Sequence, residues 1–453
     1  MKNNTIYVCS KCDAQFPKWS GRCFQCGGWA TLNEQVSEKV SKKILDRAQR
    51  GDTPAGTVMT FDELSADSLQ RLFSDLQPAA TLYPKGLPLG SVTLLAGEPG
   101  AGKSTLALQI ALNFSEQAKV LYVSAEESGS QVKEKIDRLG APKGQFYFAS
   151  DKTVEVIAST LTKHQVQVAV IDSIQTVSSN EVEAELGSIN QLKAVTVKLL
   201  AAAKENNVAV IIIGHVTKEG VVAGPKSLEH LVDIVLYLEG EADSRFRLLR
   251  ASKNRYGSAG KVSVLQMTNQ GLTVVKQPAT ALISNFQAKP GSVITAVVDS
   301  GQVLFLELQS LVNKSSFGYA KRTASGFPVK RLEVLLAVMK KRLGISLDQY
   351  DVYLNVVGGF QLKDPALDAA VCLSIISSLK NTVLNESTVI FGEVGLAGEL
   401  RVAKDTALRI ETAVKHNFTK IIIPPIGKVQ IPSKVKIISA DSLTDILQHL
   451  GWS

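Results

Sequence analysis

The stretch SVTLLAGEPGAGKSTLALQIALNF, residues 91–114, decides the fold. Its centre, GEPGAGKST at 97–105, fits the G-x-x-x-x-G-K-[ST] pattern of a phosphate-binding loop without a gap. An apolar run precedes the loop and a helical pattern follows it, and this context distinguishes such a loop from a glycine-rich turn. The sequence therefore predicts a nucleotide site at the end of a buried strand.

The residue types of this loop suit a triphosphate. Glycines let the backbone turn so that several N–H groups point at one phosphate. We expect Lys103 to neutralise β- and γ-phosphate oxygens of ATP, and Ser104 to bind Mg²⁺. The predicted cofactor-binding residues of the loop are Gly97, Glu98, Pro99, Gly100, Ala101, Gly102, Lys103, Ser104 and Thr105.

Continuous apolar runs recur between about residues 57 and 275. They include KVLYVSA, VQVAVIDS and VAVIIIGH, and amphipathic stretches separate them, with a long helix expected near 188–206. Strands of this kind are covered on both faces, so the fold class is α/β with a parallel sheet.

Polar residues follow several of these runs, where the strand tips of a parallel sheet meet the nucleotide. Asp172 ends one strand, and we expect it in the Mg²⁺ shell. Glu126 is the preferred base to orient the attacking water, and its neighbour Glu127 is the alternative. His215 ends a further strand, and a role as γ-phosphate sensor and a structural role both remain open.

Four of the five cysteines lie within the first 26 residues. Cys9 and Cys12 form one Cys-x-x-Cys pair, and Cys23 and Cys26 form another. Two such pairs are typical of a closed tetrahedral Zn²⁺ site with four thiolates, which would also supply the folding energy of so short a segment. The fifth cysteine, Cys372, lies in an apolar run and is expected in the core.

Two tryptophans, Trp19 and Trp29, flank the second cysteine pair. They could stack on a base or a protein partner, or they could pack over the metal site. The sequence leaves both alternatives open.

The bulk composition limits the class of protein. A chain of 453 residues predicts two or three domains. Its net charge of +8 is compatible with a polyanionic partner. No apolar run approaches the roughly 20 residues that span a membrane, and the first residues have no apolar signal-peptide core. We therefore expect a cytoplasmic protein without a membrane partner.

Five segments follow from these patterns. Residues 1–32 form the zinc-binding head, 33–56 a polar linker, 57–275 the ATPase domain, 276–290 a second linker and 291–453 an α+β domain. In the last domain we expect strands near 292–298 and 303–309 and helices near 329–342 and 365–379.

A set of motifs along the chain resembles one family. They are CSKCDAQFPKWSGRCFQCGGW, GEPGAGKST, YVSAEES, VIDSIQT, GHVTKEG, KNRYG and FGEVGLAGELR. In this order they resemble the RadA (Sms) family of bacterial DNA repair and recombination ATPases, over essentially the whole chain, and KNRYG is the most specific element.

The resemblance implies a RecA-type ATPase core similar to that of DnaB helicases, a zinc finger and a Lon-protease-like C-terminal domain. It further implies a homo-oligomer, a hexameric ring, that acts with RecA in branch migration on single-stranded and branched DNA. One departure is the stretch ATLYPKGLPLGS at 80–91, where we expect altered local packing rather than lost activity.

The KNRYG motif consists of Lys253, Asn254, Arg255, Tyr256 and Gly257. By resemblance, Lys253 and Arg255 are catalytic candidates that reach the γ-phosphate of a neighbouring subunit, while Tyr256 and Gly257 shape the loop. Contact with DNA phosphate is the competing role, and chemistry alone does not separate the two.

Basic residues in two segments are candidates for DNA phosphate contacts, against the alternative of a solvated surface. The first segment is the glycine-rich stretch 217–227, and the second is the basic stretch 314–342. The predicted DNA-binding residues are Lys218, Lys226, Lys314, Lys321, Arg322, Lys330 and Arg331.

Three functions are compatible with these patterns. The leading one is a DNA-dependent ATPase that drives single-stranded DNA or a branch point, and the second is an ATP-switched DNA-binding scaffold that recruits RecA without unwinding. An ATP-dependent peptidase is the third. The family resemblance places Ala366 and, less securely, Ala407 where a Lon-type peptidase has Ser and Lys, so proteolysis is disfavoured.

Overall fold

The computed structural model describes residues 5–12, 14–16, 19–36, 69–215, 225–240, 244–257, 260, 262–315, 319–362, 364–427 and 435–452. The chain divides into two compact units, Met1–Ser68 and Leu69–Ser453. Within the described residues, no helix is both long and apolar enough to cross a membrane.

The N-terminal unit contains a small antiparallel sheet of three strands, in the order β2-β1-β3. Its strands are β1 (Thr5–Cys9), β2 (Gln15–Phe16) and β3 (Leu32–Val36). The fully buried apolar side chains are only Cys9, Cys23 and Leu32 among those described. So small a core is typical of a module that a metal ion holds together.

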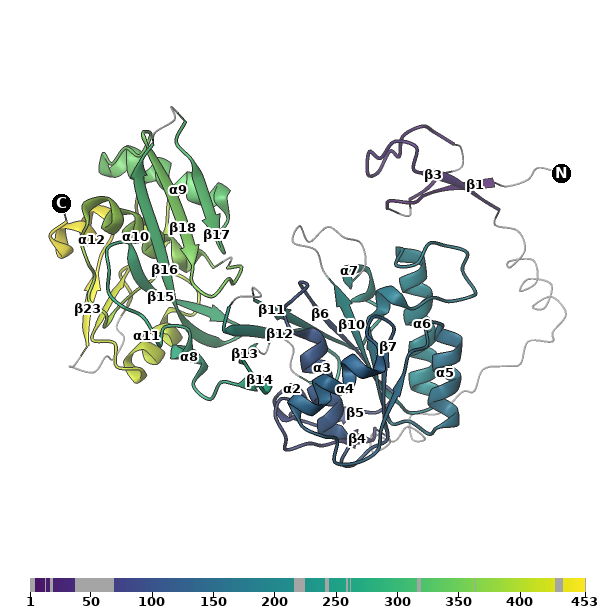
Figure 1. Cartoon of the computed structure of the whole chain (residues 1–453). Helices are drawn as coiled ribbons and strands as arrows, with labels where there is room; N and C mark the ends of the chain where they lie inside the picture. Colours follow the sequence, from purple (N-terminus) through teal and green to yellow (C-terminus); the bar gives the residue numbers. More distant parts are fainter. Residues whose placement is uncertain are drawn as a thin grey trace, which may run out of the picture. The chain divides into compact units, whose positions relative to one another are not determined.

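The second unit begins with a nine-stranded sheet in the order β14-β13-β12-β11-β6-β10-β9-β7-β8 (Figure 1). Strands β11, β6, β10, β9, β7 and β8 are parallel, and β12, β13 and β14 extend the sheet antiparallel. The strands are β6 (Val92–Gly97), β7 (Val120–Ser124), β8 (Phe146–Ala149), β9 (Val168–Asp172), β10 (Ala209–His215), β11 (Ile234–Glu239), β12 (Phe246–Asn254), β13 (Val262–Thr268) and β14 (Gly271–Val274).

Helices cover both faces of this sheet, as the continuous apolar strands predicted (Figure 1). Alternate residues of β6 serve the two faces: Leu95 packs in the cluster around α3, and Leu94 packs in the cluster around α5 and α6. The helices are α2 (Ala79–Leu82), α3 (Lys103–Phe114), α4 (Gly129–Leu139), α5 (Val154–Lys163), η3 (Ile174–Thr176), α6 (Ile189–Glu205) and α7 (Pro225–Leu228). A hairpin of β4 (Arg71–Leu72) and β5 (Leu87–Pro88) precedes the sheet. The α/β class and the long helix near 188–206 are confirmed.

A seven-stranded mixed sheet forms the rest of the unit, in the order β17-β18-β16-β15-β19-β22-β23. Its strands are β15 (Ser292–Asp299), β16 (Gln302–Lys314), β17 (Arg322–Ser325), β18 (Tyr350–Val356), β19 (Thr388–Ile390), β22 (Lys420–Ile423) and β23 (Lys436–Ser439), and β20 (Glu393–Val394) pairs separately with β21 (Leu400–Arg401). The associated helices are α8 (Pro278–Ala281), α9 (Val329–Leu343), η4 (Pro365–Leu367), α10 (Asp368–Lys380), α11 (Thr406–Lys415) and α12 (Leu443–Leu450).

This α+β part contains the strands and helices that the sequence predicted for it. Cys372 of α10 is fully buried among apolar residues, so its structural role in the core is confirmed. The Lon-like character of the domain and the domain limits stay predictions.

Candidate active site and metal centre

Four strand ends bring the predicted nucleotide residues together. In the parallel sheet, Gly97 of β6 is the register partner of His215 of β10, and Ser124 of β7 is the partner of Asp172 of β9. Since all four are carboxyl ends of strands, the loops that leave them share one edge of the sheet.

The phosphate loop lies against a neighbouring strand without room for a side chain. A Cβ atom at Gly97 would lie 2.3 Å from the carbonyl oxygen of Leu238, and Gly102 has φ +99°. Gly102 is also the N-cap of α3, and no side chain caps this helix, whereas Ser128 caps α4. The first N–H groups of α3 are therefore free of side-chain competition for phosphate.

Lys103 is buried, with 3 % of its surface exposed, and its Nζ donates a hydrogen bond to the carbonyl oxygen of Glu98 at 2.8 Å. Burial lowers the pKa of Lys103 to about 8, although the carboxylates of Asp172, Glu126 and Glu98 oppose this shift. The buried ammonium group offers a positive charge to a polyanion, and the three acids around it help to keep it protonated.

Asp172 and Ser104 form the oxygen-rich part of the site. Asp172 is buried, its Oδ2 accepts a hydrogen bond from the hydroxyl of Tyr122 at 2.7 Å, and Ser104 also bonds to it. Burial raises the pKa of Asp172 although these two hydroxyls oppose the shift. A carboxylate beside a hydroxyl is the kind of oxygen set that holds Mg²⁺ with a phosphate, so the residues fit that ion.

The two glutamates after β7 point to different partners. Glu126 Oε1 accepts a hydrogen bond from the Ser173 hydroxyl at 2.5 Å and lies 3.8 Å from His215 Nε2. Glu127 instead forms an ion pair with Lys135 of α4. Glu126 thus contacts Ser173 and lies beside His215, whereas Glu127 pairs with Lys135. Besides burial, the charges of both glutamates raise the pKa of Asp172.

His215 is half-buried beside these groups. Burial lowers the pKa of His215, and the charge of Lys103 lowers it further. The imidazole is therefore neutral near neutral pH, and its Nε2 faces the carboxylate of Glu126.

Three residues of the site were missed in the sequence. Tyr122 and Ser173 stand inside the motifs YVSAEES and VIDSIQT, so their position next to Glu126 and Asp172 was a usable signal. Arg247 carried no such signal. It is buried, and its Nε donates to the carbonyl oxygen of Ala101 at 2.9 Å, which fixes the phosphate loop from the far strand β12.

The KNRYG residues lie at the other edge of the same sheet. Asn254 pairs with Ile234 and Ile234 pairs with Thr93, at the amino end of β6, whereas the phosphate loop leaves its carboxyl end at Gly97. Four strand residues separate these positions, about 13 Å at 3.3 Å per residue. The motif therefore does not share an edge with the phosphate loop of its own chain.

Both basic residues of the motif have partners in the chain. Lys253 Nζ donates to the carbonyl oxygens of Glu229 at 2.8 Å and His230 at 3.3 Å. Arg255 Nη1 lies 3.1 Å from Oδ1 of the buried Asp233, while 53 % of the arginine side chain stays exposed.

The rest of the motif shapes the turn after β12. The side-chain oxygen of Asn254 accepts a hydrogen bond from the backbone N–H of Tyr256 at 2.9 Å. The Arg71 guanidinium lies 6.0 Å from the Tyr256 ring centroid. Together with Gly257, these residues line a cavity of about 170 Å³.

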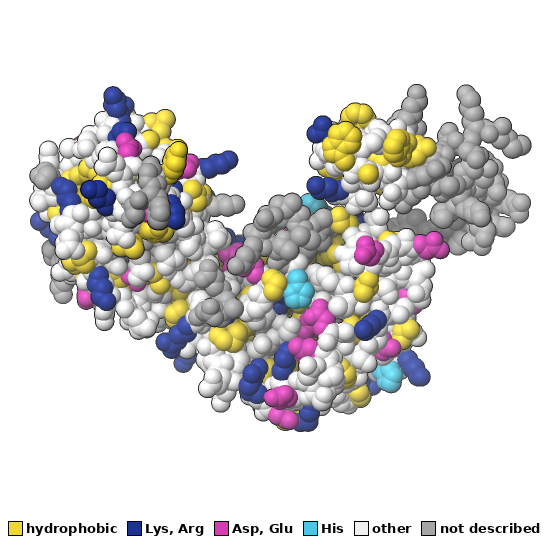
Figure 2. Space-filling model, turned by 45° about the horizontal axis from the view of Figure 1, so that its top comes forward, with side chains coloured by type: hydrophobic (Ala, Val, Ile, Leu, Met, Phe, Trp, Pro, Cys, Tyr) yellow, Lys and Arg dark blue, Asp and Glu magenta, His cyan; other side chains and the backbone are white. Residues whose placement is uncertain are grey.

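The candidate DNA contacts fall into three groups. Lys218 lies outside the described residues, and of Lys226 only the backbone, in α7, is described. Lys314, Lys321 and Lys330 are exposed around β16, β17 and α9. On the face that Figure 2 shows, Lys and Arg side chains are spread over this domain rather than gathered in one stripe.

Arg322 and Arg331 already have structural partners. Arg322 donates to the carbonyl oxygens of Tyr350 at 2.5 Å and Leu347 at 2.7 Å. Arg331 makes a two-point contact with the buried carboxylate of Asp368. Their DNA-binding role stays a prediction, and their guanidinium groups first serve the fold.

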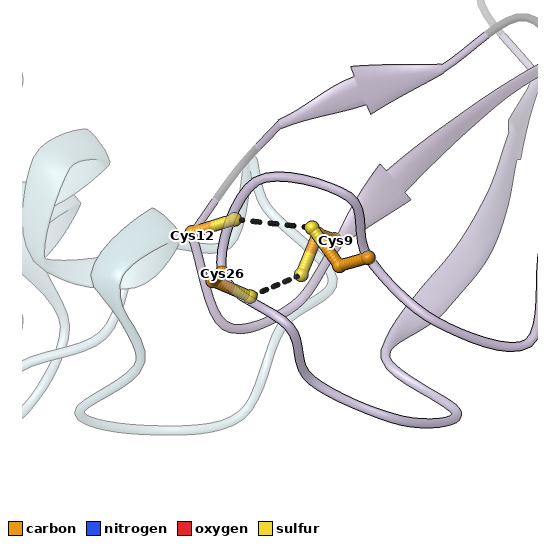
Figure 3. A group of neighbouring side chains, drawn as sticks. Cys9, Cys12 and Cys26 are labelled. Carbon is orange, nitrogen blue, oxygen red and sulfur yellow. Dashed lines mark hydrogen bonds between the residues drawn. The ribbon is translucent and has the colours of Figure 1, made fainter.

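The four N-terminal cysteines converge on one point. Their Sγ atoms all lie within 4.8 Å of one another, and the Cys9–Cys26 and Cys12–Cys23 pairs are 3.6 Å and 3.5 Å apart (Figure 3). Thiolates around a tetrahedral Zn²⁺ with Zn–S bonds of about 2.3 Å lie about 3.8 Å apart. The arrangement of the four sulfur atoms therefore fits a Zn²⁺ site.

The surroundings of Cys9 and Cys23 favour thiolate. The pKa of Cys12, which a backbone hydrogen bond with Ala14 lowers, is instead raised to about 12 by burial and the three neighbouring cysteines. Although burial raises it, hydrogen bonds with Thr31 and with backbone N–H groups lower the pKa of Cys9 to about 6. The N–H of Lys11 lies 3.4 Å from Cys9 Sγ. Such N–H donors are the usual environment of a metal-bound sulfur.

Comparisons with known proteins agree with both sites. Residues 59–221 match the family model of an AAA domain, and residues 7–34 match that of a rubredoxin metal binding domain. The DNA repair protein RadA of Pseudomonas aeruginosa is 37% identical over 452 residues, 99% of each chain, and that of Campylobacter jejuni is 38% identical over 450 residues, 99% of this chain and 100% of the relative.

The chain belongs to the RadA family of DNA repair proteins. ATP with Mg²⁺ is accordingly the ligand of its AAA domain, and Zn²⁺ is the metal of its head. Among solved structures, a KaiC-like protein of Pyrococcus horikoshii is 19% identical with a TM-score of 0.37, covering 46% of this chain and 99% of that one. The RadB recombinase is 24% identical with a TM-score of 0.35, covering 44% and 97%.

Proposed function

We propose that the chain is a DNA-dependent ATPase of homologous recombination and DNA repair, which moves single-stranded DNA or a branch point together with RecA. The RadA relatives and the AAA domain support the action on DNA and the use of ATP. The observation that carries the mechanism is the separation of KNRYG from the phosphate loop across the sheet.

This separation favours a shared active site. Lys253 and Arg255 stand too far from their own phosphate loop to touch its nucleotide, but a neighbouring copy can present its loop to them. Contacts of this head-to-tail kind close into a ring when the rotation between copies is right. We propose a hexamer, as the family resemblance implies.

Hydrolysis then divides among residues of two copies. On one copy, Lys103 and the N–H groups of α3 bind the phosphates, and Ser104 and Asp172 hold Mg²⁺, which when bound neutralises phosphate charge. Glu126 accepts the proton of the attacking water, with Ser173 and His215 orienting its carboxylate. On the other copy, Arg255 leaves Asp233 and stabilises the charge that develops on the γ-phosphate.

The DNA path is proposed to follow exposed basic side chains. Lys314, Lys321 and Lys330 are exposed and contact the backbone phosphates without reading bases. Lys218 and Lys226 are proposed for the ATPase domain on the strength of their sequence position alone.

The test is ATP turnover with and without single-stranded DNA for Lys103→Ala, Arg255→Ala and their equimolar mixture. Each variant alone should be inactive. In a randomly mixed ring, about a quarter of the interfaces combine an intact phosphate loop with an intact arginine, so about a quarter of the wild-type activity should return. An inactive mixture would show that Arg255 does not act across an interface, provided that both variants still co-assemble.

An Arg255→Lys variant serves as the control for folding, because a lysine still offers a charge to the buried Asp233. Its thermal stability should match that of the unsubstituted chain while its turnover stays low, since an ammonium group lacks the forked geometry of guanidinium.

A strand-displacement assay separates the motor from an ATP-switched scaffold that recruits RecA. The motor should displace strands in an ATP-dependent manner, whereas the scaffold would bind DNA without displacing any. A peptidase is the least supported alternative, because Ala366 is buried at η4, Ala407 lies on α11, and neither side chain carries a nucleophile or a base.

A further inference from the structure

Three aromatic rings of the N-terminal head point into solvent. Trp19 is 61%, Phe24 81% and Trp29 74% exposed, and we refer to these three as the aromatic surface. They surround the second cysteine pair in the sequence. Packing over the metal site, one of the two alternatives left open by the sequence, does not agree with these exposures.

The rings contribute little to the fold of the head. Burial of a large aromatic side chain is worth several kcal/mol, yet the buried positions of this unit go to Cys9, Cys23 and Leu32. Phe24 meets Phe16 edge-on, with the ring centroids 5.9 Å apart, while 81% of Phe24 stays exposed. The aromatic surface is therefore an unused apolar area that a ligand can cover.

A cation is held beside one of the rings. Arg22 and Trp29 face each other across an antiparallel bridge, and the guanidinium carbon lies 5.9 Å from the ring centroid. Arg22 Nε also donates to the carbonyl oxygen of Gly27 at 3.2 Å, which fixes the side chain. Figure 2 shows hydrophobic side chains next to Lys and Arg side chains on this head.

The charge of the segment favours an anionic partner. Residues 1–36, which end with β3, contain four Lys or Arg residues, Lys2, Lys11, Lys18 and Arg22, and two acids, Asp13 and Glu34. A Zn²⁺ ion with four thiolates adds −2, but that charge lies at the buried centre and faces backbone N–H donors.

We propose that the aromatic surface stacks on unpaired bases of single-stranded DNA, with Arg22 next to the phosphates. This inference rests on the proposed action on single-stranded DNA and adds a binding site outside the ATPase domain. Every base has a flat face, so stacking needs no particular sequence. The large exposed apolar residues described in this head are all aromatic, and each ring has a flat face on which a base can stack.

The chain offers an internal reporter for this test. It has three tryptophans, and Trp452 is buried with 8 % exposure, so Trp19 and Trp29 dominate the solvent-accessible emission. The full-length, zinc-loaded Trp452→Phe protein is titrated with a thymidine oligonucleotide, in the absence of nucleotide. A second oligonucleotide of equal length carries the same phosphates but abasic sugars.

Stacking predicts quenching by the thymidine oligonucleotide and little by the abasic one. Trp29→Ala should weaken the affinity for the thymidine oligonucleotide, measured through the emission of Trp19, about fivefold or more. The reason is that base stacking is worth roughly 1–3 kcal/mol per base. Trp29→Phe retains a ring and should stay within about twofold of the unsubstituted protein. Unchanged zinc content in both variants excludes a folding defect.

Two outcomes would overturn the proposal. One is binding of the thymidine oligonucleotide, detected through a label on the oligonucleotide, without any change in tryptophan emission. The other is quenching that requires an added protein such as RecA, which would assign the surface to a protein partner. Basal ATP turnover is measured on the same samples. If the unsubstituted chain does not hydrolyse ATP, the proposed function is contradicted. Base stacking is still judged by the tryptophan emission alone.

Discussion

Lys103 and Arg255 follow strands of the same nine-stranded sheet but lie beyond opposite ends of those strands. Lys103 follows the carboxyl end of β6, and Arg255 follows the strand end that pairs, through Ile234, with the amino end of β6. In the proposed mechanism, one chain therefore carries both halves of a hydrolytic site and cannot combine them by itself. Two copies in head-to-tail contact can, which is why assembly and ATP turnover are linked in the proposed mechanism.

The affinity for ATP should depend on pH through Lys103. Because its pKa is lowered to about 8, the ammonium form that attracts phosphate is complete below this pH and is lost as the pH rises through it. We expect binding to be constant near neutral pH and to weaken by up to about tenfold per pH unit above pH 8. Equilibrium binding of a fluorescent ATP analogue measures this effect.

Lys103→Arg is the matched variant for this prediction. A guanidinium group stays charged throughout this range, so its affinity, whatever its absolute value, should not vary with pH. The same pH dependence in both proteins would assign the titration to another group.

Replacement of Glu126 by Gln should lower kcat about 10²- to 10⁴-fold, since an amide cannot accept the proton of water. ATP binding should be almost unchanged, because the carboxylate of Glu126 accepts a hydrogen bond from Ser173 and lies beside His215. It makes no hydrogen bond with Lys103 in the described residues. Steady-state turnover and nucleotide binding are measured in parallel.

Glu127→Gln provides the comparison, since Glu127 Oε1 pairs with Lys135 of α4 rather than with Ser173 or His215. Loss of a partly exposed ion pair should change stability by about 1 kcal/mol or less and leave kcat within a fewfold. A larger loss of kcat for Glu127→Gln than for Glu126→Gln would reverse the assignment of the base.

Arg331→Ala should destabilise the C-terminal part of the chain by about 3–5 kcal/mol, because it leaves the buried Asp368 without its partner. Its neighbour Lys330 is exposed, so Lys330→Ala should change stability by about 0.5 kcal/mol or less. Urea unfolding followed by circular dichroism measures both. If both substitutions change the free energy of unfolding equally and only slightly, Arg331 is not needed for the fold and is available for DNA binding.

Zinc analysis should find one metal ion per chain, and Cys23→Ala should abolish it. Loss of one thiolate from a four-thiolate site removes most of the affinity and with it the fold of the head. Cys372→Ala is the control, because that thiol is buried in the core and should leave the zinc content unchanged. Retention of stoichiometric zinc in Cys23→Ala would contradict the four-cysteine site.

Features that a few consecutive residues encode could be predicted from the sequence. The phosphate loop, the two Cys-x-x-Cys pairs and the acid at the end of VAVID each need only a few neighbouring residues, and their local geometry follows from chain stereochemistry. The strand positions were readable for the same reason, since a strand covered on both faces is apolar throughout. Asp172, Glu126 and His215 were therefore placed at one edge before any contact was known.

Only the tertiary structure decided which side chains meet. Glu126 and Glu127 are adjacent, and the sequence cannot tell which one faces Ser173. Arg247 supports Ala101 across 146 residues of chain, and Arg331 meets Asp368 across 37. Such contacts depend on the register between strands and on the packing of helices over them, and both are set by the whole core. The same holds for the aromatic surface and for the edge on which KNRYG lies, because burial and strand order belong to the assembled fold.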